Sequence, residues 1–307
     1  MKKIVIYGNC HTIPIAYMLE KALSETGDYV VIPCTQIQNI KDSSYFDQDF
    51  IYEADFFVHM DIRKDNGFGY ERSSEYVISK LSKKCTTIAI PNLFGFGKCF
   101  FPQICSDDLY LNDTHGNKLF LRDSIIDGWL DEHTVCKTGK LKRTYDTALD
   151  GKLNFAHDLN GLFSKIESRE AKWDIKILGF IKDNYRNHQL FYEPNHPTEM
   201  VFKYIVHELL INYFIASVDE DLLQNAYETS PRLDNLEIPI LKCVKDAYDL
   251  QWDNHDHLRM SKDDVWHHMN IDSYVDYYCA YSSLRKDINI LQRMICGTRL
   301  VYLKKFS

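Results

Sequence analysis

The sequence lacks two features that would each assign the chain to a class of proteins. It has no run approaching the ~18 consecutive apolar residues of a membrane span, and the apolar run at residues 4–7 is too short for a signal peptide. It has no excess of positive charge, because 44 acidic residues outnumber 36 basic ones and give a formal net charge of −8. A dedicated nucleic-acid binder normally carries the opposite sign, so we expect no nucleic-acid partner and no membrane span.

The cysteines follow no pattern that a secreted or zinc-binding protein would need. There are nine, at irregular spacings and without a Cys-x-x-Cys pair, whereas disulfide frameworks and zinc knuckles have regular spacings. We therefore expect a cytoplasmic protein with reduced thiols. His255-x-His257 and His267-His268 offer an alternative metal site, but their acidic, Trp-rich surroundings favour solvated surface histidines, and we predict no metal.

Four short runs rich in β-branched residues predict an α/β fold. They cover residues 3–7, 29–32, 56–60 and 86–90. Helical spacing follows the first run, with Thr12 as the expected N-cap, and a short helix near residues 74–81 precedes the fourth. Short strands separated by helical segments imply a small parallel sheet flanked by helices. With 307 residues and 45% hydrophobic content, the chain can bury a substantial core.

The second half of the chain is predicted to be more helical. Residues 158–166 read as a helix, residues 190–192 as a last short strand, and the four-residue apolar spacing at 201–213 as a helix that Thr198 caps. We divide the chain into an α/β catalytic domain at 1–217 and a mostly helical C-terminal region at 218–307 packed on it.

Polar side chains, with one glycine before them, follow several of the predicted strands, at the sheet edge where ligands bind in open parallel sheets. They are Gly8, Asn9, Cys10 and His11 after the first strand, His59, Asp61 and Arg63 at the end of the third, Asn92 after the fourth, and Asn195 and His196 after the last. This convergence predicts a site at the carboxyl edge of the sheet.

Cys10 and His196 are the strongest catalytic candidates. The sulfur of Cys10 would face the start of the first helix, where free amides and the helix dipole favour the thiolate. Pro194 and Pro197 restrict the backbone around His196 and fix the direction of its imidazole, as a general base requires. The alternatives are a small buried thiol and a histidine that caps a turn.

Four motifs together resemble the WcbI-like family of polysaccharide-biosynthesis proteins, which are regarded as acetyltransferases and are similar to SGNH hydrolases. The motifs are Gly8-Asn9-Cys10, Ile90-Pro91-Asn92 through Phe101-Pro102, Arg169-Glu170, and Leu190-Phe191-Tyr192 with Asn195-His196-Pro197-Thr198. The resemblance covers roughly residues 1–215. It implies a three-layer α/β fold of the SGNH and flavodoxin type, with the nucleophile after the first strand.

The resemblance also implies roles for single residues. Cys10 stands in place of the SGNH serine, His196 matches the base, and Asn92 is a possible oxyanion donor together with the backbone N–H of Cys10 or His11. Glu193 stands where an Asp usually precedes the late histidine by three, and His11 where the family usually has Gln. Coenzyme A or acetyl-CoA is implied as cofactor, with a sugar hydroxyl as acceptor.

Cofactor binding needs cations for the phosphates and apolar groups for the pantetheine arm. Arg63, Lys64, Arg72 and Lys98 lie in loops on the predicted binding side, and Phe94 could flank the arm or merely line the core. A basic run at Lys137, Lys140, Lys142 and Arg143 is interpreted as a solvated loop. The residues assigned to cofactor binding are Gly8, Asn9, His11, Arg63, Phe94, Lys98 and Asn195.

The resulting hypothesis is a CoA-dependent acetyltransferase that modifies a sugar hydroxyl during capsular or surface polysaccharide biosynthesis. Two alternatives stay open. One is an SGNH-like esterase or deacetylase that uses the same residues with water as acceptor. The other is a non-catalytic module that binds coenzyme A or a glycan-assembly complex. The sequence also leaves open whether Cys10 is a covalent nucleophile and whether the chain forms a homo-oligomer.

Overall fold

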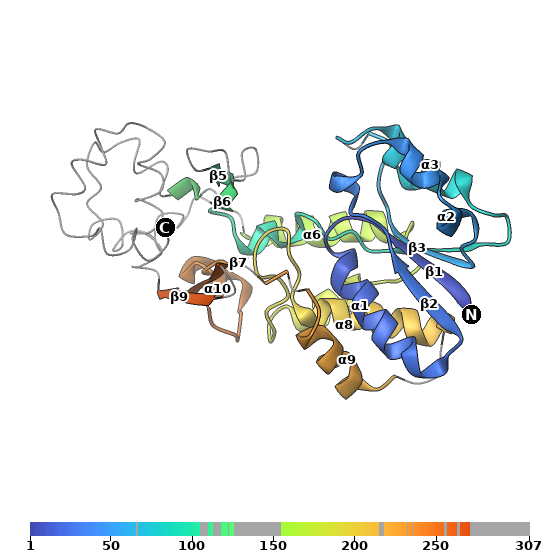
Figure 1. The fold of residues 1–307 in the computed structure, drawn as a ribbon. Helices are drawn as coiled ribbons and strands as arrows, with labels where there is room; N and C mark the ends of the chain where they lie inside the picture. The colour runs from blue at the N-terminus through green and yellow to red at the C-terminus, as the bar shows by residue number, and fades with distance from the viewer. Residues whose placement is uncertain are drawn as a thin grey trace.

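A four-stranded parallel sheet organises the N-terminal part of the chain (Figure 1). The computed structural model describes residues 1–104 except 66, the stretches 110–112, 118–121 and 123–125, and 155–270 except 215–217, 232, 235, 255–256 and 263–264. The strands are β1 (Lys2–Tyr7), β2 (Tyr29–Pro33), β3 (Phe56–Met60) and β4 (Thr86–Ile90). They lie in the order β2-β1-β3-β4, and every neighbouring pair is parallel. The predicted α/β fold is confirmed.

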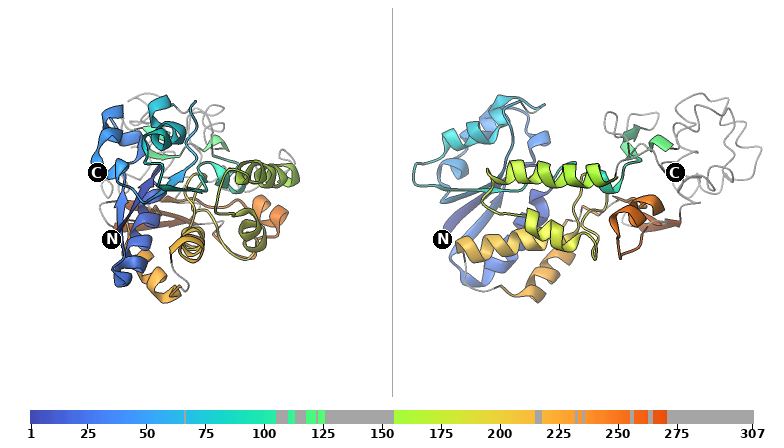
Figure 2. Two further views of the ribbon diagram at one scale, coloured as in Figure 1. Left: turned by 90° about the vertical axis from the view of Figure 1, so that its right-hand side faces the viewer. Right: turned by 180° about the vertical axis from the view of Figure 1, so that it is seen from behind.

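Helices cover both faces of this sheet, which explains why its strands are short apolar runs. On one side lie α1 (Thr12–Leu23), α8 (Glu199–Leu209), which continues as the π-helical turn η6 (Leu210–Phe214), and α9 (Glu220–Glu228). On the other lie the 3₁₀ helix η3 (Ser43–Asp47), α2 (Asp49–Tyr52) and α3 (Ser74–Lys80) (Figures 1 and 2).

Ring contacts on the two sides of the sheet follow from the alternation of side chains along a strand. Phe56 packs edge-on against Phe214 of η6 at a centroid distance of 5.1 Å. Tyr7 points to the opposite face and packs edge-on against Phe46 of η3 at 5.5 Å. The three layers are therefore held together by aromatic packing on both sheet faces.

One helix start differs from its prediction. Ser73 caps α3, since its hydroxyl accepts the N–H of Tyr76 at 3.2 Å. Thr12, by contrast, is the first residue of α1 and not its N-cap: His11 holds that position, and the Thr12 hydroxyl donates to the Asn9 carbonyl at 2.8 Å. The turn after β1 therefore uses Thr12 to brace its own backbone.

The segment from 155 to 198 leads from two helices into a tight turn. The helices are α6 (Phe155–Glu170) and α7 (Leu178–Asn184). Residues 190–192 form no strand: one antiparallel bridge joins Phe191 to Pro197, and the N–H groups of Tyr192 and Thr198 close a loop onto the carbonyls of His196 and Leu190, each at 2.9 Å. A strand cannot extend here because Pro194 and Pro197 have no N–H to donate to a ladder.

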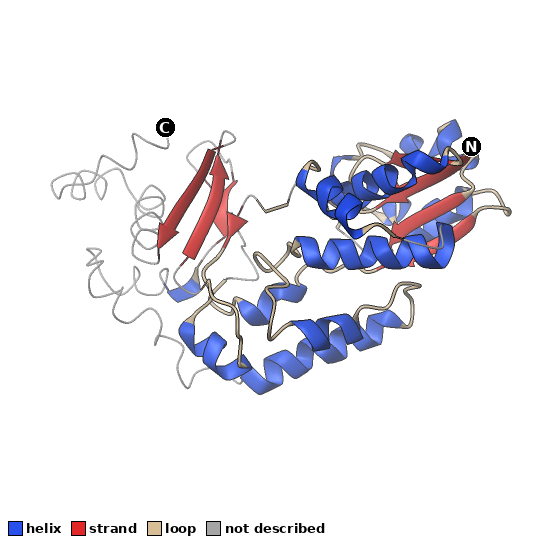
Figure 3. Ribbon diagram, turned by 90° about the horizontal axis from the view of Figure 1, so that it is seen from below, coloured by secondary structure: helices blue, strands red, loops and turns tan. Residues whose placement is uncertain are grey.

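The C-terminal part contains a second sheet. β7 (Leu236–Glu237), β8 (His257–Lys262) and β9 (Val265–Asn270) are antiparallel and lie well away from the parallel sheet (Figure 3). A further antiparallel pair joins β5 (Tyr110–Asn112) to β6 (Lys118–Leu121). The helical expectation for 218–307 holds for α9 and α10 (Lys242–Tyr248), whereas the β7-β8-β9 sheet was not predicted and residues 271–307 lie outside the described part.

Two described segments after residue 217 contact the α/β part. Helix α9 contacts α1, and the N–H of Ile238 donates to the carbonyl of Tyr192 at 3.0 Å. The predicted domain boundary falls at residues 215–217, outside the described residues, and stays a prediction. Among the helices that the structure describes, none has the length and apolar character that crossing a membrane requires.

Candidate active site

Cys10, His196 and Glu193 form a line at the carboxyl edge of the parallel sheet. The Sγ atom of Cys10 lies 3.7 Å from Nε2 of His196, and Nδ1 of the same ring lies 3.0 Å from Oε1 of Glu193. When Nδ1–H donates to the carboxyl group, Nε2 presents its lone pair to the thiol. Residues 186 positions apart in sequence thus meet in the arrangement of a nucleophile, a base and an orienting acid.

Two hydrogen bonds and a close backbone approach fix the turn that carries Glu193 and His196. The N–H of Asn195 donates to Oε2 of Glu193 at 2.9 Å, and the N–H of Gly97 donates to the carbonyl of Pro194 at 3.0 Å. A Cβ at Gly97 would lie 2.8 Å from the Glu193 carbonyl oxygen, so a glycine is needed for this approach. Glu193 and Asn195 are both 2% exposed. The imidazole of His196 is therefore presented by a rigid turn.

Asn9 and Asn92 join the ends of β1 and β4 beside the sulfur. The amide nitrogen of Asn9 donates to Oδ1 of Asn92 at 3.2 Å, while its oxygen accepts the N–H of His11 at 3.0 Å. Oδ1 of Asn92 also accepts the N–H of Phe94 at 3.3 Å. With its oxygen engaged twice, Asn92 has its amide N–H groups available to donate, as an oxyanion donor must.

Three of the residues predicted to bind the cofactor lie inside the protein. His11 is 1% exposed, and its Nε2–H donates to the Asn195 carbonyl at 2.7 Å. Its ring meets that of His196 edge to face at 6.1 Å. Gly8 lies where a Cβ would come within 2.8 Å of Met60 Sδ. Together with the buried Asn195, these residues pack inside the protein next to the Cys10 and His196 side chains.

The predicted phosphate-binding cations already have partners within the chain. Nε of Arg63 donates to Asp65 at 2.8 Å, and Nζ of Lys64 lies 3.1 Å from Glu75. Arg72 donates to the carbonyls of Phe68 and Lys41, each at 2.8 Å. Lys98 donates to the carbonyl of Ile104. Phe94 is 46% exposed, so its ring is available to a ligand. Arg72 in particular ties two loops together.

Burial sets the protonation states of the site. It raises the pKa of the Cys10 thiol to about 11, with a further increase from Glu193, and lowers the pKa of His196 to about 4. It also raises the pKa of Glu193 to about 7, and lowers that of His11 to about 3 with help from His196. Desolvation outweighs the amides at the start of α1, so the expected thiolate is replaced by a neutral thiol facing a neutral imidazole.

Two groups of sequence candidates belong to the part of the chain that the structure does not describe. The basic run Lys137, Lys140, Lys142 and Arg143 lies outside the described residues, as do His255 and the side chains of His257, His267 and His268. Within the described part of the chain, no group of three or more His, Cys, Asp and Glu side chains could hold a metal ion. Among the cysteines described there, Cys10, Cys34, Cys85 and Cys99 are free thiols.

Comparison with known proteins identifies the family. A model of the polysaccharide biosynthesis enzyme WcbI matches residues 3–213, a stretch that includes the parallel sheet and the whole Cys10–His196–Glu193 line. The chain belongs to the WcbI family of polysaccharide biosynthesis enzymes. The resemblance expected from the sequence motifs is thus confirmed, and the site described above is a site of a WcbI family member.

A solved WcbI structure shares the fold. The two chains superpose with a TM-score of 0.68 at 17% sequence identity, over 92% of this chain and 89% of the other. That structure is described as native WcbI, a novel polysaccharide biosynthesis enzyme, without a disulfide bond between coenzyme A and one of its cysteines. No curated protein matches the chain.

Proposed function

We propose that this WcbI family member is a coenzyme A-dependent acyltransferase that moves an acetyl group to a sugar hydroxyl. The observation that carries the proposal is the line from Cys10 Sγ through the His196 ring to Glu193, with separations of 3.7 and 3.0 Å. The solved WcbI structure is described by the state of a disulfide bond between coenzyme A and a cysteine, and this association supports a thioester donor. The family's place in polysaccharide biosynthesis supports a saccharide acceptor.

The residues at the sheet edge fit a thioester. Coenzyme A would supply an activated acyl group and leave as a thiol. Cys10 is partly exposed, so a carbonyl carbon can approach its sulfur. The amide of Asn92 and the backbone N–H of Cys10 are the donors for the developing oxyanion, because the N–H of His11 already donates to Asn9.

His196 handles the proton in this proposal. Nε2 takes a proton either from the acceptor hydroxyl or from the Cys10 thiol, as the new bond to the acyl carbon forms. It returns the proton to the departing thiol sulfur when the C–S bond breaks, so the ring ends as it began. Glu193 accepts Nδ1–H throughout and stabilises the transient imidazolium.

The test is acetyl transfer from acetyl-CoA to sugar acceptors by purified wild type and variants. For His196→Ala we expect a loss of roughly 10²–10⁴-fold, the range for removal of a general base. His188→Ala is the matched control, because His188 is exposed on the surface. Cys10→Ser and Cys10→Ala separate the two proton routes: only the covalent route requires the sulfur.

The same assay discriminates the alternatives. Release of acetate from acetylated sugars without an added acceptor would identify a hydrolase. Folded His196→Ala and Cys10→Ala variants that retain full biological activity would instead indicate a binding module and refute the catalytic proposal.

A further inference from the structure

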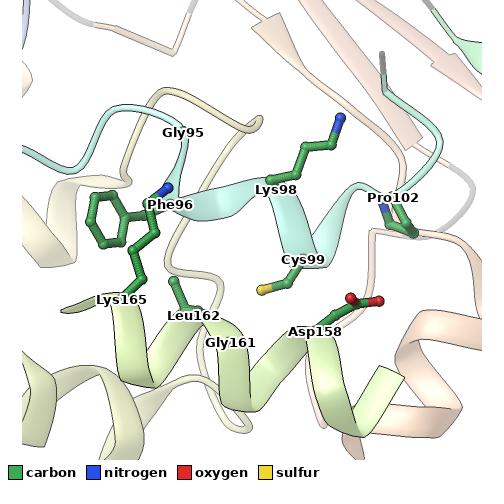
Figure 4. A pocket seen from close by; sticks show the side chains of 9 residues that line it. All are labelled: Gly95, Phe96, Lys98, Cys99, Pro102, Asp158, Gly161, Leu162 and Lys165. Carbon is green, nitrogen blue, oxygen red and sulfur yellow. The ribbon is translucent and has the colours of Figure 1, made fainter. Parts of the chain in front are cut away.

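A cavity of about 310 Å³ lies between the 3₁₀ helix η5 (Phe96–Phe100) and α6 (Figure 4). Its lining includes Phe96, Lys98 and Cys99 from η5 and Asp158, Leu162 and Lys165 from α6. The site residues Cys10, His196 and Glu193 do not line it. The cavity is therefore lined by other residues than the proposed reacting groups.

Two cations share one aromatic ring beside this cavity. Nζ of Lys165 lies 4.6 Å from the ring centroid of Phe96, and the guanidinium carbon of Arg169 lies 5.1 Å from the same centroid. The ring itself is buried, so the two charged groups cover it. Cation–π attraction holds each group in place, but like charges four residues apart on a helix repel.

No ion pair among the described residues offsets this repulsion, although one carboxylate, Asp158, lines the same cavity. Within the described part of the chain, neither Lys165 nor Arg169 lies in an ion pair. The adjacent carboxylate, Glu170, instead accepts the N–H groups of Ile177 and Leu178 at the start of α7. Burial and the neighbouring Arg169 lower the pKa of Lys165, as expected for a cation without a counter-ion.

The cation pair is linked to the turn of Glu193 and His196 through the aromatic ring that both cations contact. Phe96, the ring under both cations, directly precedes Gly97, whose N–H donates to the Pro194 carbonyl at 3.0 Å. Pro194 lies between Glu193 and His196 in the turn that presents the imidazole. A ligand whose anionic end rests on Lys165 and Arg169 would thus be anchored beside the element that fixes the site.

We propose that Lys165 and Arg169 form an anion site that binds the phosphate groups of the thioester donor. A guanidinium matches phosphate oxygens in a bidentate manner, and a lysine adds a point charge. An arriving phosphate would replace the repulsion between the two cations by attraction to both. The inference rests on the proposed function for the identity of the ligand, while the unpaired cations and the cavity select its phosphate chemistry.

The experiment is calorimetric titration of coenzyme A, adenosine 3′,5′-bisphosphate and pantetheine into wild type, Lys165→Gln and Arg169→Gln. Each variant should bind coenzyme A and the bisphosphate roughly tenfold more weakly or worse, the usual loss for a charged hydrogen bond. Pantetheine, which has no phosphate, should bind all three proteins equally. Lys182→Gln is the matched control and should bind like wild type, because Lys182 of α7 also lies over an aromatic ring, with its Nζ 5.3 Å from the ring centroid of Phe163.

The outcomes separate this inference from the proposed function. Coenzyme A that binds wild type and both Gln variants equally overturns the anion site and leaves the acyltransferase proposal standing. Bisphosphate binding that depends on Lys165 and Arg169, without acetyl transfer, supports the anion site and refutes the acyltransferase. Failure of wild type to bind either phosphorylated compound overturns the anion site.

A further variant guards against a folding defect. Arg169→Lys keeps the charge but loses the bidentate fork of the guanidinium, so its affinity for coenzyme A should fall between those of wild type and Arg169→Gln. A loss as large as that of Arg169→Gln would assign the effect to packing and overturn the anion site.

Discussion

Replacing Glu193 by Gln should change how the stability of the protein depends on pH. Burial raises the pKa of this carboxyl from 4.5 to about 7. Between these values the folded protein binds a proton that the unfolded chain has lost, so the free energy of unfolding falls as pH rises through this window. A shift of about 2.5 units at 1.36 kcal/mol per unit is a loss of about 3 kcal/mol by pH 8. Glu193 is 2% exposed, so solvent screens little of it.

Glutamine removes this titration but keeps the size of the side chain. Its amide cannot accept both the N–H of Asn195 and Nδ1–H of His196, which adds a constant cost of about 1–3 kcal/mol. The pH-dependent part is therefore isolated in the difference between the two proteins. His11 and His196 are present in both proteins, so the parts of their titrations that do not depend on Glu193 cancel in that difference.

The assay is urea unfolding of wild type and Glu193→Gln at half-unit steps from pH 4.5 to pH 8.5. The stability of the variant relative to wild type should increase with pH by about 3 kcal/mol and level off above pH 8. A difference that stays flat across this range, or that decreases, would mean that the carboxyl titrates near its ordinary value, and the desolvation argument for the whole site would fail.

The remaining predictions concern the turn, the thiol and the pH profile of the reaction. Gly97→Ala should lower the unfolding free energy by about 1–3 kcal/mol, since its Cβ meets backbone at 2.8 Å, while Gly161→Ala, which meets nothing within 4 Å, should be neutral or slightly stabilising in the same urea titration. The rate at which iodoacetamide labels Cys10 should increase with pH up to at least pH 9. It should be comparable to the rate for Cys85, because burial also raises the pKa of that thiol to about 11. A labelling rate that levels off below pH 7 would show a stabilised thiolate. Acetyl transfer should rise with pH through about 7, as Glu193 ionises and makes His196 more basic, and the rise should be absent in Glu193→Gln.

The arrangement of the site was predictable because it depends on local signals and one topological rule. The β-branched runs place β1 and β4 correctly, and parallel strands bring their carboxyl ends to one edge. Cys10 and Asn92 follow those strands directly, so their proximity needs no knowledge of packing. The restricted turn at Pro194 and Pro197 then predicts a fixed imidazole, and the structure brings that imidazole to the sulfur.

Other features depend on packing between distant segments and could not be predicted in this way. The helix start at Cys10 predicts a thiolate, but the surrounding protein removes the water that a thiolate needs. Arg63 pairs with Asp65 two residues away, but the spacing of the two residues in the sequence does not tell whether the arginine pairs within the chain or binds a ligand. Lys165 and Arg169 were missed although their four-residue spacing on one helix face was a usable signal, because the ring beneath them comes from residue 96.

The same physical cause accounts for the uncharged reaction centre and for the separate location of the cations. Burial shifts Cys10, His196 and His11 toward their neutral forms, and Glu193 ionises only near pH 7. A phosphate placed among these groups would oppose the ionised Glu193 and the developing oxyanion, and it would pay a desolvation cost without a counter-charge. A thioester and a sugar hydroxyl are neutral and suit such a centre. A donor that carries phosphates therefore needs cations other than the groups around the sulfur, and in our proposal Lys165 and Arg169 of α6 supply them.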